Sequence, residues 1–147
     1  MKIISENRRA RFDYEILETY EAGIELNGQE VKSIKTGRMN MGASYAIIRG
    51  GEAWLLNTEI PAYQPKNAPA DYASDRTRRL LLRTSQIKEL TGRLHEKGLS
   101  LIPVKTYLKK NLIKVELGLA RNRKKIDKRE VIKKREVNRE ISRNLKN

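Results

Sequence analysis

The 147-residue chain contains no cysteine, one histidine, one tryptophan and one phenylalanine. The absence of cysteine excludes disulfides, zinc ribbons and thiol catalysis. No apolar run approaches the roughly 18 residues of a membrane-spanning helix, and the opening MKIISENRRARFDY lacks the apolar core of a signal peptide. These absences favour a cytoplasmic protein without a membrane partner.

Catalytic groups are also scarce. The single histidine, His95, falls on a helix predicted over residues 84–97, where a packed or solvated histidine is more common than a catalytic one. The chain has no dinucleotide fingerprint, no P-loop and no HExxH motif, and its carboxylates show no motif spacing. We therefore expect no enzymatic activity, no cofactor and no metal site, and an enzyme acting on RNA is the disfavoured alternative.

Positive charge is what the sequence has in excess, with a formal net charge of +14. The last 27 residues, 121–147, hold twelve Lys or Arg against four Asp or Glu, a net charge of +8. A charge so concentrated predicts a polyanionic partner, which could be RNA, DNA or an anionic membrane surface. We call residues 121–147 the tail and residues 1–120 the body.

The tail contains neither Gly nor Pro, so nothing in it forbids a helix. Val137, Ile141 and Leu145 recur at helical spacing, but a stripe one residue wide buries too little to offset the entropy of ordering. We therefore predict a tail that is disordered when free and becomes helical against a polyanion. A solvated basic extension without a specific role fits the same composition.

The body shows short alternating apolar segments separated by turn residues. Gly50-Gly51 between two apolar runs predicts a two-residue hairpin connection. We expect strands at 12–20, 24–26, 45–49, 52–56, 99–108 and 112–119, and helices at 29–36 and 84–97. Closing short antiparallel strands removes exposed edges. The fold class is thus predicted as mainly β, a small OB-like barrel, closed or partly open, with one or two external helices. An open α+β sheet is the alternative.

Two basic stretches of the body are candidate RNA contacts. Lys105, Tyr107 and Lys109 alternate along a predicted strand, which would place an aromatic ring between two cations, an arrangement that suits base stacking. An ordinary solvated strand face fits the same pattern. The other stretch precedes the first strand and is a candidate phosphate-contacting edge or a solubilising arm. It comprises Asn7, Arg8, Arg9 and Arg11.

One acidic residue stands out on this basic body. Glu21 interrupts the first predicted strand within Glu21-Ala22-Gly23. A carboxylate can accept a hydrogen bond from a base amino group or from a ribose 2′-hydroxyl. Glu21 is therefore either an RNA contact or a turn residue.

Four stretches of the chain, in this order, resemble one known family. They are NRRARFDYEILETYEAGIELNGQEVKSIKTGRMN, SYAIIRGGEAWLLN, DRTRRLLL and KVELGLARNRKKIDKREVIKKRE. They are similar to the SmpB family, whose members bind transfer-messenger RNA, and the resemblance extends over residues 7–143. It implies an OB-like barrel followed by a functional tail.

The resemblance also implies site residues. Its RNA-contact positions fall on Glu21, Leu81 and Lys114, although the residue pattern alone would place Leu81 in the core. In the tail, it implies a motif that acts near the decoding centre of the ribosome. The candidate residues there are Arg123, Lys124, Asp127, Lys128, Arg129, Lys133, Lys134 and Arg135.

The implied function is that of an adaptor in trans-translation, the rescue of stalled bacterial ribosomes. Such a protein binds the tRNA-like domain of transfer-messenger RNA and carries it to the A site, while its tail enters the empty mRNA channel. The implied partners are that RNA, the small ribosomal subunit with its 16S rRNA, and elongation factor Tu bound to the same RNA. The protein would be a monomer. A ribosomal or ribosome-assembly protein, whose tail threads rRNA, is the alternative.

Two positions depart from the family pattern. Asn122 replaces a glycine between body and tail, and because Asn tolerates positive φ we expect a hinge there to survive. Ile126 replaces His or Tyr before Asp127, and an aliphatic side chain cannot stack on a base as those rings can.

Overall fold

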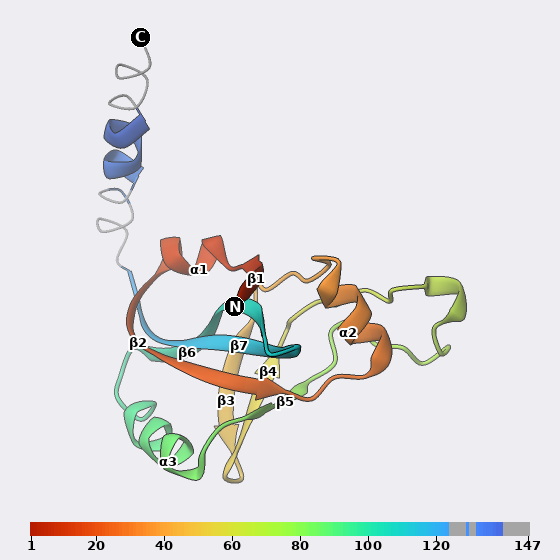
Figure 1. Ribbon diagram of the computed structural model, residues 1–147. Coiled ribbons are helices and arrows are strands. Elements are labelled where there is room, and N and C mark those ends of the chain that lie inside the picture. Colours follow the sequence, from red (N-terminus) through yellow and green to blue (C-terminus); the bar gives the residue numbers. More distant parts are fainter. Residues whose placement is uncertain (124–128, 130–131, 140–147) are drawn as a thin grey trace.

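The computed structural model describes residues 1–123, 129 and 132–139. Within them the chain forms seven strands, three α-helices of the body and one 3-10 turn (Figure 1). Their bounds are β1 Lys2–Glu6, α1 Arg8–Asp13, β2 Tyr14–Ile24, α2 Gly28–Lys35, β3 Tyr45–Arg49, β4 Glu52–Leu56, η1 Pro65–Asn67, β5 Arg78–Leu81, α3 Thr84–Arg93, β6 Leu99–Lys109 and β7 Leu112–Asn122.

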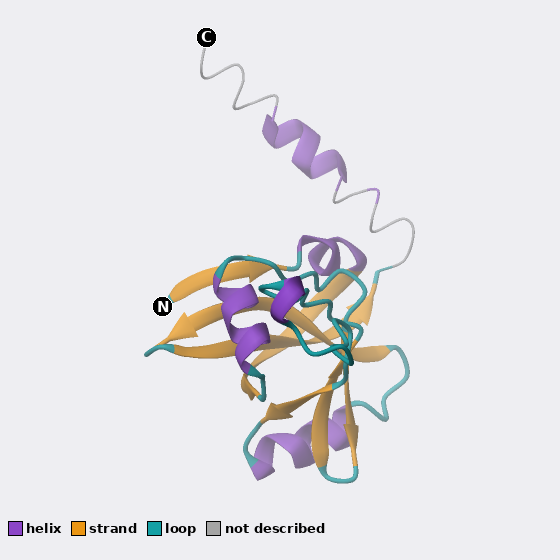
Figure 2. Ribbon diagram, turned by 90° about the vertical axis from the view of Figure 1, so that its right-hand side faces the viewer, coloured by secondary structure: helices purple, strands orange, loops and turns teal. Residues whose placement is uncertain are grey.

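The strands close into a ring. Their order is β1-β6-β3-β4-β5-β2-β7, and β7 also pairs with β6. Six strands therefore form a barrel, and β1 adds to the edge of β6 (Figures 1 and 2). The OB-like β-barrel predicted from the sequence is confirmed, and the open sheet is wrong. The helices lie outside the barrel, and they number three rather than one or two.

Alternation along β7 builds one wall of the core. Val115, Leu117 and Leu119 are fully buried and pack inside the barrel, while the intervening Lys114 and Glu116 face outward. The hairpin between β3 and β4 also forms as predicted. Gly50 and Gly51 both adopt positive φ, as a tight turn of this kind requires.

Two predicted elements have different limits. Phe12 belongs to α1 rather than to a strand, because the Asn7 side chain accepts a hydrogen bond from Ala10 N–H and begins a helix there. The helix expected over 84–97 ends at Arg93, so His95 lies in the turn that follows it. Strand β1 was missed because its KIISE sequence does not alternate clearly.

A buried ion pair fastens α2 to the barrel. The Glu30 carboxylate contacts both Arg76, at 2.6 Å, and Arg78, and the side chains of Glu30 and Arg78 are fully buried. Arg78 also donates to the carbonyl oxygens of Thr58 and Ser74, at 2.7 and 2.9 Å. One guanidinium thereby holds the start of β5, helix α2 and both ends of the intervening loop together.

Strand β7 extends two residues beyond the predicted boundary at 120, to Asn122. Asn122 pairs with Tyr14 in the ladder between β7 and β2, and it is not among the residues with positive φ. The predicted hinge at Asn122 is therefore wrong. Arg123 donates from its backbone N–H to Asp13 O and from Nε to Tyr14 O, at 2.9 and 3.2 Å. Arg123 thus belongs to the body, contrary to its place among the tail candidates.

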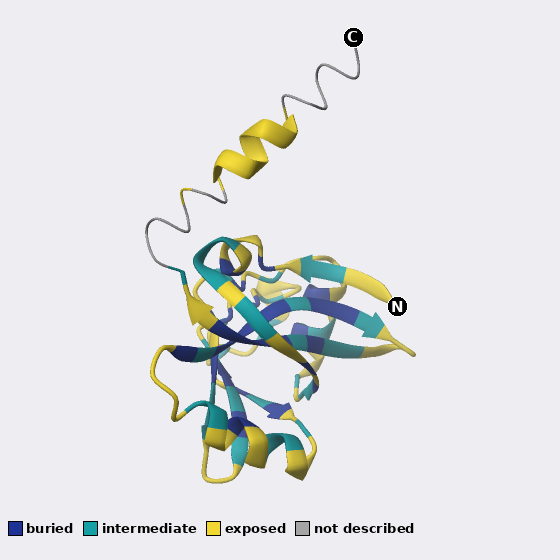
Figure 3. Ribbon diagram, turned by 90° about the vertical axis from the view of Figure 1, so that its left-hand side faces the viewer, coloured by how far each residue is buried: buried dark blue, intermediate teal, exposed yellow. Residues whose placement is uncertain are grey.

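The described tail residues beyond this point are helical at 129 and 132–139, and exposed (Figure 3). Arg129, Lys133, Lys134 and Arg135 are among them, whereas Lys124, Ile126, Asp127 and Lys128 lie outside the described residues. The Arg135 guanidinium lies 5.9 Å from the Phe12 ring centre. Disorder of the free tail stays a prediction.

Candidate nucleic-acid interface

The register of three neighbouring strands brings three sequence-distant residues into one row. On β2, Gly23 pairs with Lys114 of β7 on one side and with Leu81 of β5 on the other. Cross-strand partners point to the same face of a sheet, here the outer face of the barrel. Residues Lys114 and Leu81 therefore flank a glycine that has no side chain of its own.

This row forms the base of an open groove of about 680 Å³ on the barrel surface. The start of α3 and the turn between β6 and β7 complete the groove. We name it the β2–β5–β7 groove. It is lined by Glu21, Gly23, Leu81, Leu82, Arg83, Gln86, Lys109, Lys110, Leu112 and Lys114.

Gly23 keeps the groove open. A Cβ atom at this position would lie 3.2 Å from the Cβ of Leu81 and 3.4 Å from its Cδ1. Such an approach is tighter than ordinary van der Waals contact, so any side chain here would displace Leu81.

We expect Gly23→Ala to weaken RNA binding by displacing Leu81 while leaving the barrel folded. The affinity loss should be about threefold to tenfold, measured by filter binding to the tRNA-like RNA, because one contact moves and the charges remain. Gly92→Ala is the matched control, since a Cβ there meets no atom within 4 Å. Equal affinities of the two variants would contradict this role for Gly23.

Glu21 is held at the groove by an ion pair. The Lys109 Nζ lies 3.1 Å from its Oε2. Beneath this pair, burial, followed by the negative charges of Glu21 and Glu116, raises the pKa of Tyr107 to about 12. Tyr107 therefore stays a neutral phenol at physiological pH.

The groove combines positive charge with exposed apolar surface. Arg83, Lys109, Lys110 and Lys114 face a single acid, Glu21. Between them, Leu81 and Leu112 are 47% and 59% exposed. Cations suit a phosphate backbone, a fixed carboxylate suits a base or a 2′-hydroxyl, and exposed leucines suit sugar or base faces.

The structure brings some predicted RNA contacts together and separates others. Glu21, Leu81, Lys109 and Lys114 all line the β2–β5–β7 groove. The arginines of α1 are not among its lining residues; Arg8 and Arg9 line other hollows beside α1. Leu81 was expected in the core from its apolar neighbours, and this expectation is wrong because β5 turns its side chain outward.

Three of the predicted RNA contacts, Lys105, Tyr107 and Asn7, make contacts within the protein. Lys105, Tyr107 and Lys109 do share a strand face, but Tyr107 is only 5% exposed, so base stacking on it is not possible in this structure. Lys105 Nζ lies 3.7 Å from Glu116 and 5.9 Å from the Tyr107 ring centre.

Asn7 is the third of these residues. It is 5% exposed, and its Nδ2 donates to the carbonyl oxygens of Met41 and Pro103, at 3.0 and 2.8 Å. With its side-chain oxygen occupied by the helix cap, Asn7 fixes α1 rather than contacting RNA.

Sequence reasoning missed six groove residues, namely Gly23, Leu82, Arg83, Gln86, Lys110 and Leu112. Lys110 and Asn111 form the β6–β7 turn with φ values of 50° and 64°. Positive φ at both residues is what a two-residue hairpin turn requires. The signal available in the sequence for Arg83 and Lys110 was the clustering of basic residues at 76–83 and 105–114. None of the helices in the described residues combines the length and apolar character needed to cross a membrane.

These features define a class of protein, a small closed OB-like barrel with a cationic groove and a basic tail. The family model described as SmpB protein matches residues 4–147. The chain therefore belongs to the SmpB family.

Relatives and a solved structure agree with this assignment. SsrA-binding proteins of Gloeothece citriformis and Synechocystis sp. are 50% and 47% identical, and each match covers 99% of this chain and 94% and 95% of the relative. A structure described as "tmRNA-SmpB: a journey to the center of the bacterial ribosome" is 47% identical with a TM-score of 0.69. That match covers 82% of this chain and 85% of the solved one.

Proposed function

We propose that this protein is the RNA-binding adaptor of trans-translation in its cell. It binds the tRNA-like domain of transfer-messenger RNA and delivers it to the A site of stalled ribosomes. The observation that most strongly supports this proposal is that Glu21, Leu81 and Lys114, which are distant in sequence, line one groove. The names of the relatives and of the solved structure support the choice of RNA.

In this proposal the β2–β5–β7 groove binds the folded tRNA-like RNA. Lys114, Lys109 and Arg83 neutralise phosphates at its rim, and the affinity they supply falls as salt rises. Glu21, held by Lys109, accepts a hydrogen bond from a base or a 2′-hydroxyl. Leu81 packs against a sugar or base face left open by Gly23.

The tail acts on the ribosome rather than on the tRNA-like RNA. Its described cations, Arg129, Lys133, Lys134 and Arg135, are exposed at helical positions (Figure 3), and Arg135 lies 5.9 Å from the Phe12 ring centre of α1. We propose that the tail enters the vacant mRNA channel beside the 16S rRNA and orders there. Elongation factor Tu reaches the protein through the shared RNA.

The proposed role needs no chemistry from the protein itself. An adaptor holds two partners in register, and we propose that the chain is a monomer without enzymatic activity, cofactor or metal. Because ribosomes work in the cytoplasm, we propose a cytoplasmic location. A ribosomal protein with the same tail would instead bind ribosomes stably without transfer-messenger RNA, which co-sedimentation with ribosomes in the absence of that RNA would detect.

We expect Lys114→Ala to weaken binding to the tRNA-like RNA roughly tenfold, equivalent to about 1.4 kcal/mol. The plot of log affinity against log salt should flatten by about one unit, as for the loss of one phosphate contact. Lys66→Ala, which removes an exposed lysine from the loop near α2, should leave both values unchanged. Equal affinity and slope for wild type and Lys114→Ala would contradict a contact at Lys114.

A peptide of residues 124–147 should show little helix by circular dichroism in buffer, because its apolar stripe is too thin to support a helix alone. Helical content should rise when an RNA duplex that mimics a small-subunit helix is added. A strongly helical spectrum in buffer alone would contradict ordering on binding.

A further inference from the structure

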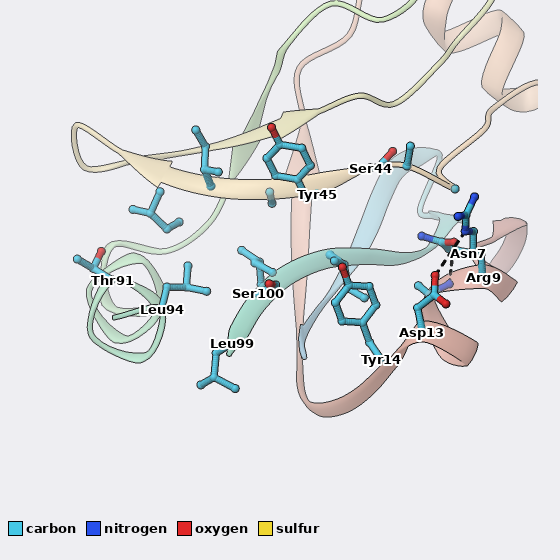
Figure 4. A pocket seen from close by; sticks show the side chains of 18 of the residues that line it. Asn7, Arg9, Asp13, Tyr14, Ser44, Tyr45, Thr91, Leu94, Leu99 and Ser100 are labelled. Carbon is cyan, nitrogen blue, oxygen red and sulfur yellow. Dashed lines mark hydrogen bonds and ion pairs between the residues drawn. The ribbon is translucent and has the colours of Figure 1, made fainter. Parts of the chain in front are cut away.

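The tail leaves the barrel at the junction between α1 and β2. Arg123, the first residue after β7, donates from its backbone N–H to Asp13 O at 2.9 Å and from its side-chain Nε to Tyr14 O at 3.2 Å. Asp13 is in turn paired with Arg9, one turn earlier in α1, at 3.4 Å between Oδ2 and Nε (Figure 4). The point from which the tail starts is therefore fixed against α1.

A second contact joins the tail to the same junction. The Arg135 guanidinium lies 5.9 Å from the ring centre of Phe12, the residue that precedes Asp13. Arg135 follows Arg123 by twelve positions, so the two contacts are separate in sequence. Their partners are nevertheless three consecutive residues, Phe12, Asp13 and Tyr14. The junction therefore contacts the tail itself and not only the end of β7.

Phe12 offers the tail an aromatic ring rather than a charge. It is the only phenylalanine of the sequence, and it lies half-buried in the last turn of α1. The negative face of such a ring attracts a guanidinium within about 6 Å of its centre, and at exposed sites this attraction shifts an equilibrium by a factor of about two to five. A contact of this strength holds the tail without locking it.

The charges beside the ring oppose the contact. Arg8, Arg9 and Arg11 are exposed on α1, and the tail has a net charge of +8. Dissolved salt screens repulsion between exposed charges, whereas it weakens the binding of cations to the phosphates of RNA. Docking of the tail on α1 should therefore strengthen as salt rises, while binding of the tail to RNA weakens.

We propose that Phe12 is the docking partner of the tail in the free protein. The Arg135 guanidinium rests on its ring, and this contact supports the helix at 132–139 until ribosomal RNA binds the tail cations. RNA releases the contact because a phosphate offers a guanidinium stronger, bidentate hydrogen bonds than a ring does. The docking joins two parts of one chain and stands without RNA binding; only its release by RNA rests on the proposed function.

Nuclear magnetic resonance of the full chain labelled with ring-¹³C phenylalanine tests the docking, because the label reports on Phe12 alone. The aromatic signals should differ between the full chain and a chain that ends at Arg123. Arg135→Ala should remove at least half of this difference, and Arg135→Lys, which keeps the charge, should remove less. Lys133→Ala is the matched control and should remove less than a tenth. Both positions are exposed, so these variants should fold.

The helix of the tail is a second readout. Subtracting the circular-dichroism spectrum of the chain that ends at Arg123 from that of the full chain isolates the signal of residues 124–147. This signal should show about two to five times as much helix as the free peptide of the same residues, because only the full chain supplies Phe12. Phe12→Leu, which keeps an apolar side chain in α1, should remove the excess, and thermal melting checks that this variant folds.

Identical Phe12 signals in the full and the shortened chain, or in Arg135→Ala and wild type, would overturn the docking. Equal helix in the free peptide and in the full chain would overturn it as well. Adding an RNA duplex that mimics a small-subunit helix should return the Phe12 signals to those of the shortened chain. A duplex that binds the tail without moving these signals would refute release by RNA, whereas a duplex that does not bind would count against the proposed role of the tail instead.

Discussion

A chain that ends at Arg123 is expected to bind the tRNA-like RNA with nearly full affinity and to lose peptide tagging on stalled ribosomes. The cut falls after Arg123 so that the bonds at the end of β7 are kept: Asn122 pairs with Tyr14, and Arg123 donates to the carbonyls of Asp13 and Tyr14. A cut at Arg121 would remove these bonds and confuse loss of the tail with damage to the barrel.

The expected loss of tagging is large because the removed residues 124–147, with ten Lys or Arg against four Asp or Glu, are the segment that we propose enters the mRNA channel. Affinity for the tRNA-like RNA should change by about twofold or less, since none of the β2–β5–β7 groove residues is removed. Tagging should fall below a tenth of the wild-type rate in a reconstituted translation assay. A control chain with Lys133→Ala and Lys134→Ala should tag at a rate between those of the wild-type and the shortened chain. Wild-type tagging by the shortened chain would show that the tail is dispensable.

Glu30→Gln is expected to destabilise the fold by about 3–5 kcal/mol, the usual result of removing one partner from a buried ion pair. The change leaves the Arg78 guanidinium buried without its counter-charge and weakens the link to Arg76. Urea unfolding followed by circular dichroism measures the effect. Glu52→Gln is the matched control, because its 3.1 Å pair with Arg79 is exposed on both sides, and it should cost less than about 1 kcal/mol.

The pH dependence of the free energy of unfolding is a second way to test the contribution of Glu30. Burial alone would raise the pKa of Glu30, but hydrogen bonds from Arg76, the Asn27 backbone and Arg78 outweigh it, and the pKa is lowered below its ordinary value of 4.5. The unfolded chain then binds more protons at low pH, so this stabilisation is present above pH 4.5 and declines as pH falls below it. Glu30→Gln should flatten that decline. An unchanged pH profile would show that Glu30 is not the titrating group.

Local patterns predicted local structure well. The β3–β4 hairpin follows from two apolar runs and a Gly-Gly turn, all within twelve residues. The β6–β7 hairpin follows in the same way from alternation on both sides of Lys110 and Asn111. Closure of the barrel was inferred from the need to pair strand edges, and the β6–β7 ladder provides it.

What the sequence could not supply was the pairing of distant segments. Leu80 and Leu81 are adjacent leucines, yet the first is buried and the second exposed, and only the register of β5 with β2 decides which. Tyr107 lies on the predicted face but is covered by the side chains around it. The buried pair of Glu30 and Arg78 joins residues 48 positions apart, which no local pattern indicates.

Site-specific photo-cross-linking on stalled ribosomes tests the division of roles most directly. A photoreactive residue would replace Leu81 in one chain and Ile132 in another. Both side chains are exposed; Leu81 lines the β2–β5–β7 groove and Ile132 lies on the tail helix. The account predicts that position 81 links to transfer-messenger RNA and position 132 to 16S rRNA. Linkage of position 81 to ribosomal RNA alone, or of position 132 to transfer-messenger RNA alone, would contradict it.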